Sequence, residues 1–83
     1  MELNETMKIK LEHDKASEVR EIMTDVYSAL TIKGYDPISQ LVGYIISGDP
    51  TYITSYNGAR SKIVKVERDE LLEELVKHYI NSL

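Results

Sequence analysis

Three kinds of side chain in this sequence are of types that could carry chemistry: a threonine near the N-terminus, tyrosines mixed with bases, and separate histidines and carboxylates. Thr6 follows Glu5 in a stretch with no apolar period, as in a mobile tail. A phosphate on its hydroxyl would add about −1.5 to −2 charge and three acceptor oxygens. Thr6 is therefore a candidate modification site, although any tail threonine offers the same hydroxyl.

The segment Tyr52–Lys65 mixes tyrosines with the bases Arg60, Lys62 and Lys65. Such a mixture can stack on a nucleic-acid strand and neutralise it. Three bases can neutralise only about three phosphates, and each such contact adds about one unit to the slope of log affinity against log salt concentration. They therefore support only weak binding to nucleic acid. A protein partner or a phosphorylated side chain explains this composition better than nucleic acid does. An ordinary mixed surface without a binding role explains it about equally well. We predict partner contacts at Tyr56, Arg60, Lys62 and Lys65.

Neither the histidines nor the carboxylates form a catalytic or metal-binding pattern. His13 and His78 lie outside any metal-ligand spacing, and His78 pairs more simply with Glu74 one helical turn earlier. The acids at 67–74 suit the positive end of a helix and a solvated face. The glycines form no phosphate-binding motif. The sequence thus predicts no enzyme, metal or cofactor.

Charge and composition narrow the class of protein. The 83 residues carry a net charge of −4 and contain no cysteine, so the chain has no disulfide or thiolate metal site. The acidic balance argues against a general nucleic-acid binder. The segment 34–66 is the only basic third, with a net charge of +1 from two acids and three bases. No long apolar run or basic leader is present, so we expect a cytoplasmic protein without membrane insertion.

The N-terminal part changes its hydrophobic period near residue 14. Apolar and polar residues alternate over 7–12, which predicts a short extended segment. From 15 to 33 the apolar residues follow a helical stripe, with Asp14 as the expected N-cap and Gly34 as the expected C-terminal glycine.

Two Asp-Pro pairs, at 36–37 and 49–50, predict helix starts, since the aspartate accepts free amide protons and proline needs no donor. The first opens a helix that ends at Gly48. Gly43 within it either allows another backbone to approach closely or is simply tolerated. At most one or two turns are expected after the second pair, before a turn at Asn57-Gly58.

The last helix is predicted from Arg68 to Asn81. Its apolar stripe is wider than is needed to pack against the core of its own chain alone. A chain of this size buries only about 60–65% of its unfolded surface, so self-association would add stability. We therefore predict a homodimer whose interface uses one face of this helix: Leu72, Leu75, Val76, Tyr79 and Ile80.

Several sequence blocks resemble the IreB family, also known as ReoM, small cytosolic regulators of Gram-positive bacteria. They are Asp-Val-Tyr at 25–27, Lys-Gly-Tyr-Asp-Pro-Ile at 33–38, Gln-Leu-Val-Gly-Tyr-Ile-Ile-Ser-Gly-Asp-Pro at 40–50, Asn-Gly-Ala-Arg at 57–60 and Glu-Arg-Asp-Glu-Leu-Leu-Glu-Glu-Leu-Val at 67–76. The resemblance covers nearly the whole chain, and the block from Gly34 to Pro50 is the most specific part of it.

The resemblance implies a non-enzymatic, all-helical homodimer that is a substrate of the membrane-anchored Ser/Thr kinase with PASTA repeats and of its cognate phosphatase. It implies a role in peptidoglycan homeostasis and cephalosporin tolerance, at least partly through Clp-protease degradation of a peptidoglycan-precursor enzyme. The family phosphoacceptor matches Thr6. Leu3 stands where some members have a second threonine, and Ser55 and Val64 stand where some have arginine.

We therefore predict an all-α, homodimeric bundle of four to five short helices, with a flexible or extended segment over 1–14 and a single helical dimerisation domain over 15–83. The predicted function is a phosphorylation-switched regulator acting with a kinase, a phosphatase and the Clp system or its substrate. The alternative is a small nucleic-acid-binding accessory protein that uses the segment Tyr52–Lys65.

Overall fold

The chain is built entirely from helices in the computed structural model, which describes the backbone of residues 2–83 and the side chains of residues 15–83. The elements follow in the order α1 (Glu2–Ile32), α2 (Pro37–Ser47), the 3-10 turns η1 (Pro50–Tyr52) and η2 (Tyr56–Gly58), α3 (Ala59–Ile63) and α4 (Arg68–Asn81). No strand occurs among residues 2–83. The all-α prediction is confirmed, and the limits of α4 are those expected.

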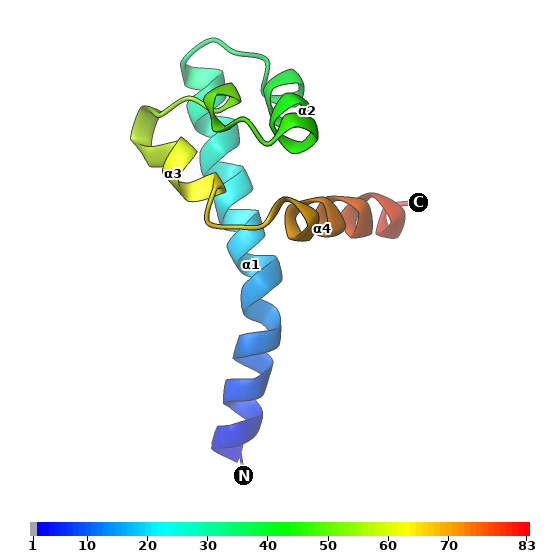
Figure 1. Cartoon of the computed structure of the whole chain (residues 1–83). Coiled ribbons are helices and arrows are strands. Elements are labelled where there is room, and N and C mark those ends of the chain that lie inside the picture. Colours follow the sequence, from blue (N-terminus) through cyan, green and yellow to red (C-terminus); the bar gives the residue numbers. More distant parts are fainter. Residues whose placement is uncertain (1) are drawn as a thin grey trace.

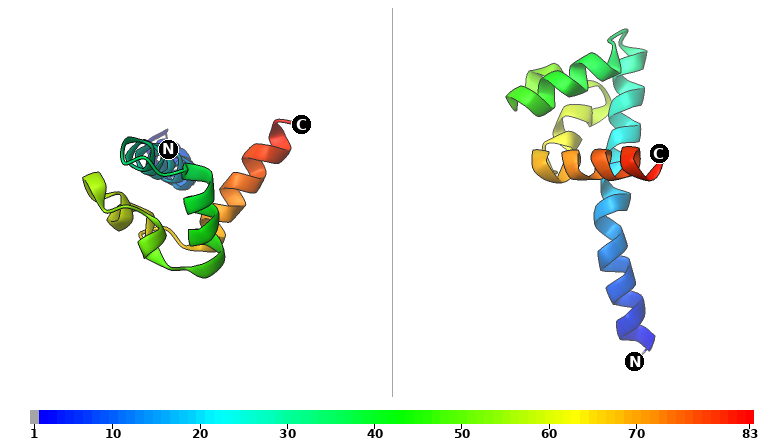
Figure 2. Two further views of the ribbon diagram at one scale, coloured as in Figure 1. Left: turned by 90° about the horizontal axis from the view of Figure 1, so that it is seen from above. Right: turned by 90° about the vertical axis from the view of Figure 1, so that its right-hand side faces the viewer.

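The long helix α1 is the support on which the other elements are arranged. Figure 1 shows α2, α3 and the 3-10 turns gathered around the C-terminal half of α1, while α4 projects crosswise from it. Seen from above in Figure 2, α2 and α4 diverge from a common corner. No helix among residues 2–83 is both long and apolar enough to span a membrane.

The hydrophobic core lies between α1 and the elements that cover it. Buried side chains at i, i+3, i+7, i+10 and i+11 form the α1 stripe: Val19, Ile22, Val26, Ala29 and Leu30. Ala59, Ile63 and Val66 pack against it from α3 and the following turn. Tyr44, Ile53 and Leu71 complete the buried set within residues 15–83.

The N-terminal region differs from the sequence-based expectation. Helix α1 begins at Glu2, so residues 7–12 are helical where an extended segment was expected, and Asp14 lies inside the helix where an N-cap was expected. Residues 2–14 contain no glycine or proline and include strong helix formers such as Glu, Leu, Lys and Met, so nothing local stops the helix. The division into a segment 1–14 and a domain 15–83 stays a prediction.

Glycines end α1 and α2 as predicted. Gly34 has φ +84°, its amide donates to the Thr31 carbonyl at 3.0 Å, and the next amide, of Tyr35, donates to the Leu30 carbonyl at 2.9 Å. These two bonds are the Schellman arrangement, which requires a left-handed residue. Gly48 closes α2 with φ +75°.

Both Asp-Pro pairs cap helical turns as expected. Asp36 accepts the Ile38 amide at 3.2 Å at the start of α2, and Asp49 accepts the Thr51 amide at 3.0 Å at the start of η1. The Thr51 hydroxyl also donates to Asp49 at 2.7 Å. These bonds stabilise the carboxylate and lower the pKa of Asp49, with a smaller contribution from the Arg60 charge.

Gly43 allows a close approach, but the approaching group is a side chain where a backbone was expected. A Cβ at this position would lie 2.5 Å from a ring carbon of Tyr52. Gln40 fixes the same residue by donating from Nε2 to the Tyr52 carbonyl at 2.9 Å. Helix α2 and turn η1 are therefore joined through the Tyr52 ring.

Replacing Gly43 by alanine tests this contact, because the contact decides whether the substitution raises or lowers the free energy of unfolding. Gly43→Ala gains about 1 kcal/mol of helix propensity but forces the Tyr52 ring to move, and overpacking of this kind costs about 1–3 kcal/mol. We expect a net loss of about 1 kcal/mol in the free energy of unfolding, measured by urea denaturation. In a Tyr52→Ala background the same change should stabilise the protein; stabilisation in both backgrounds would show that the ring does not restrict Gly43.

Candidate functional site

The predicted partner-binding residues do not form one cluster of free cations. Arg60 and Lys62 both lie on α3, but their side chains reach different elements. The Arg60 Nε donates to the Ile53 carbonyl at 2.8 Å, and the Lys62 ammonium lies 3.1 Å from the Asp25 carboxylate on α1. Lys65 is exposed, and its ammonium makes no ion pair or hydrogen bond with residues 15–83.

Arg60 therefore has a structural role beside any role in binding. Its backbone amide donates to the Thr54 carbonyl at 3.1 Å, so main chain and side chain together hold the segment that follows η1. The buried Ile53 lies in that segment. The sequence reasoning treated Arg60 only as a surface base, because a contact with a loop carbonyl seven residues earlier has no sequence signature.

Tyr56, the fourth predicted contact residue, lies in η2 next to the end of α1. The Lys33 ammonium stands 5.4 Å from the centroid of its ring, within the range of a cation–π contact. Lys33 was not among the predicted residues. The bases and tyrosines of this segment thus reach different elements, which weakens the nucleic-acid alternative because that function needs one continuous basic track.

The predicted phosphoacceptor Thr6 lies within the residue range of α1. Its side chain is outside the residues whose side chains the structure describes, and so is that of His13. Among the described residues, no group of three or more His, Asp or Glu side chains could hold a metal ion.

The predicted interface helix α4 places most of its apolar stripe at the surface. Leu71 is fully buried and Leu75 is partly buried against the core. The other apolar side chains of the stripe are exposed, up to 68% for Tyr79: Leu72, Val76, Tyr79 and Ile80. The contact of Leu75 with the core of its own chain was not expected from the sequence.

Helix α2 carries a second exposed apolar face, which was not predicted from the sequence. Ile38 and Ile46 are 74% and 78% exposed, and Val42 lies between them on the same face. The residues of α2, PISQLVGYIIS, include no charged side chain. The absence of charge was the sequence signal for this exposed face, because a helix without a charged side is normally covered by other elements on every side.

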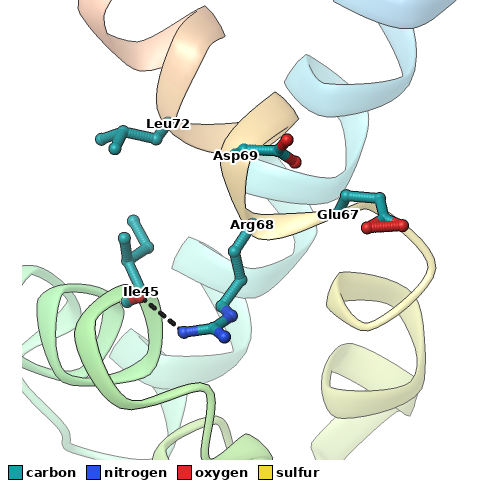
Figure 3. Close-up of a pocket in the computed structure, with 5 residues that line it drawn as sticks. All are labelled: Ile45, Glu67, Arg68, Asp69 and Leu72. Carbon is teal, nitrogen blue, oxygen red and sulfur yellow. Dashed lines mark hydrogen bonds between the residues drawn. The ribbon is translucent and has the colours of Figure 1, made fainter.

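An open pocket lies at the corner between α2 and α4. The pocket has a volume of about 410 Å³ and is lined by Ile45, Glu67, Arg68, Asp69 and Leu72. Figure 3 shows Ile45 and Leu72 on one side and the Arg68 guanidinium reaching toward the end of α2. We call the exposed apolar side chains of α2 and α4 together the α2–α4 surface: Ile38, Val42, Ile46, Leu72, Val76, Tyr79 and Ile80.

Comparison with known families relates this architecture to a recognised group. The IreB regulatory phosphoprotein family matches residues 4–81. The chain belongs to the IreB family. A UPF0297 protein of Ruminiclostridium cellulolyticum is 55% identical over 82 residues, covering 99% of this chain and 93% of that protein. A UPF0297 protein of Acetivibrio thermocellus is 59% identical over 82 residues, covering 99% and 91%.

Membership of the IreB family confirms the resemblance found in the sequence and places the chain among regulatory phosphoproteins. The matched residues include Thr6, the segment Tyr52–Lys65 and all of α4.

The structural role of Arg60 can be separated from a role in binding. Arg60→Gln loses the part-buried bond to the Ile53 carbonyl, and a bond from a charged donor contributes about 1.5–3 kcal/mol. We expect the free energy of unfolding to fall by about 1–2 kcal/mol in urea denaturation. Lys65→Gln removes the same charge from an exposed position and should change stability by less than about 0.5 kcal/mol. Equal effects of the two changes would contradict this role.

Proposed function

We propose that this IreB-family protein is a non-enzymatic regulator switched by phosphorylation of Thr6. The kinase is the membrane-anchored Ser/Thr kinase with PASTA repeats, and its cognate phosphatase reverses the reaction. The regulated process is peptidoglycan homeostasis and cephalosporin tolerance, through Clp-dependent degradation of a peptidoglycan-precursor enzyme. The observation that carries the proposal is the match to a regulatory phosphoprotein family over residues that include Thr6.

The charge distribution supports a switch of this kind. Lys65 is exposed and makes no ion pair with residues 15–83, and the half-exposed Lys62–Asp25 pair is worth at most about 1 kcal/mol. A phosphate or an acidic partner can take Lys62 from Asp25 at little cost. A phosphate on Thr6 adds about −1.5 to −2 charge to an already acidic protein. It either occupies these cations or repels an acidic partner, and both change the surface available for docking.

The phosphoacceptor can be tested directly with the kinase domain and ATP. We expect a single phosphate on the wild-type chain, located on Thr6 by mass spectrometry, and none on Thr6→Ala. Ser28→Ala removes an exposed hydroxyl from the same helix and should leave phosphorylation unchanged. Phosphorylation of Thr6→Ala to the wild-type extent would refute the assignment.

We further propose that the chain acts as a homodimer through the α2–α4 surface. Leu72, one of the predicted interface residues of α4, lines the same pocket as Ile45 of α2. Both helices also expose apolar side chains, so a second copy could cover both at once. An exposed apolar surface of this extent is typical of an interface. An isologous dimer would pair each surface with its own equivalent.

Two valines provide a matched test, because Val76 in the α2–α4 surface and Val64 outside it are each 50% exposed. Val76→Asp places a charge in the interface and should weaken dimerisation at least tenfold, about 1.4 kcal/mol, in sedimentation velocity. Val64→Asp should leave dimerisation unchanged. A monomeric wild-type chain, or equal dimerisation of the two variants, would exclude this interface.

A further inference from the structure

Arg68, the first residue of α4, lies against the C-terminal end of α2. Its Nη1 donates to the Ile45 carbonyl at 2.9 Å, as Figure 3 shows. Arg68 is 23 residues from Ile45 in the chain, so the bond joins two helices that are not consecutive in the sequence. It lies at the corner from which α2 and α4 diverge (Figure 2).

The Ile45 carbonyl is free to accept this bond because of the way α2 ends. Its helical donor would be the amide of Asp49, but the chain turns at Gly48 and the Asp49 amide donates to the Ser47 hydroxyl at 3.0 Å. Carbonyls in the last turn of a helix need partners from outside it. Helix α2 has no basic residue in its own last turn, so Arg68 also supplies the cation that favours the negative end of the helix dipole.

Gly48 makes room for the Arg68 side chain. A Cβ at Gly48 would lie 2.7 Å from the guanidinium carbon, so any larger residue displaces the guanidinium. Gly34 at the end of α1 is a natural control, because it also has a left-handed φ but a Cβ there would meet nothing within 4 Å. The two glycines share the backbone requirement and differ in the contact with Arg68.

Few other contacts of the described residues fix the direction of α4. In its first two turns Leu71 is buried, Leu75 is partly buried against the core, and Glu70 lies 3.0 Å from the ammonium of Lys15 on α1 in an exposed ion pair. A helix of 14 residues is about 21 Å long, so a rotation of about 10° at its base moves its far end by about 4 Å. A displacement of that size would mismatch the side chains of any tightly packed interface.

We propose that Arg68 is a positioning residue that fixes the angle between α2 and α4 and so sets the shape of the α2–α4 surface. It does this by bonding the end of α2, without needing to contact a second copy. This inference rests on the homodimer proposed above, and it assigns to Arg68 the control of dimer affinity.

The test measures the angle and the dimer separately. Because the chain has no cysteine, spin labels on Ser39→Cys in α2 and His78→Cys in α4 report one intramolecular distance by electron resonance, with unlabelled chain in excess. We expect a narrow distance distribution in the otherwise unchanged protein and a broad or shifted one with Arg68→Ala or Gly48→Ala. The same two changes, without labels, should weaken dimerisation at least tenfold in sedimentation velocity.

Gly34→Ala is the matched control, since it strains the backbone as Gly48→Ala does but leaves Arg68 in place. It should lower the melting temperature while leaving the distance distribution and dimerisation unchanged. Arg68→Lys, which keeps a donor and a charge, should restore part of the narrow distribution. If Arg68→Ala does not fold, Arg68→Gln and Gly48→Ala allow the same comparison.

The outcomes separate this inference from the dimer proposal. Distance distributions that are the same for Gly48→Ala, Arg68→Ala and Gly34→Ala would overturn the role of Arg68, even if the chain dimerises. A chain that is monomeric at every concentration, yet shows the broadened distribution in Arg68→Ala, would refute the homodimer and support the role of Arg68 in fixing the angle.

Discussion

The rest of the structure depends on the burial of one stripe of α1. Five of the eleven buried apolar residues found among residues 15–83 lie on that helix, and the remaining elements are arranged to cover them. Helix α3 with its following turn supplies three more buried side chains, whereas α2 and α4 supply one each, Tyr44 and Leu71. Each of these two helices therefore contacts the core along only one side. Several of their other apolar side chains are exposed, and the homodimer proposal rests on this incomplete burial.

Different parts of the chain have different proposed roles. The proposed phosphoacceptor Thr6 lies near the start of the 31-residue helix α1, and the surfaces proposed to contact a partner or a second copy lie within residues 15–83. Arg60 and Arg68 have corresponding roles in that body, because each donates to a carbonyl of a neighbouring element, Ile53 and Ile45. Arginine suits this use, since its planar group keeps its charge and donates in several directions. The loss of either charge is therefore expected to affect the fold as well as any partner.

Local signals in the sequence predicted much of this architecture. The limits of α4, the Asp-Pro caps and the glycines that end α1 and α2 all follow from residues within one or two turns of each feature. Contacts distant in sequence could not be read in this way, such as Lys62 with Asp25, 37 residues apart. The separation of Arg60 from Lys62 depends on such contacts, and so does the approach of Tyr52 to Gly43. The exposed face of α2 was missed because its spacing is also that of a core helix, and only the absence of charge distinguishes the two.

We propose that α2 and α4, which are incompletely covered in one chain, are covered by a second copy. Hydrogen exchange measured over a range of protein concentrations tests this most directly, because it reports each helix in the unmodified protein. We expect amide protection in α2 and in the second half of α4 to rise as the protein associates. Protection in the buried half of α1 should change little. Protection in α2 and α4 that does not vary with concentration, in a chain that stays monomeric, would contradict this proposal.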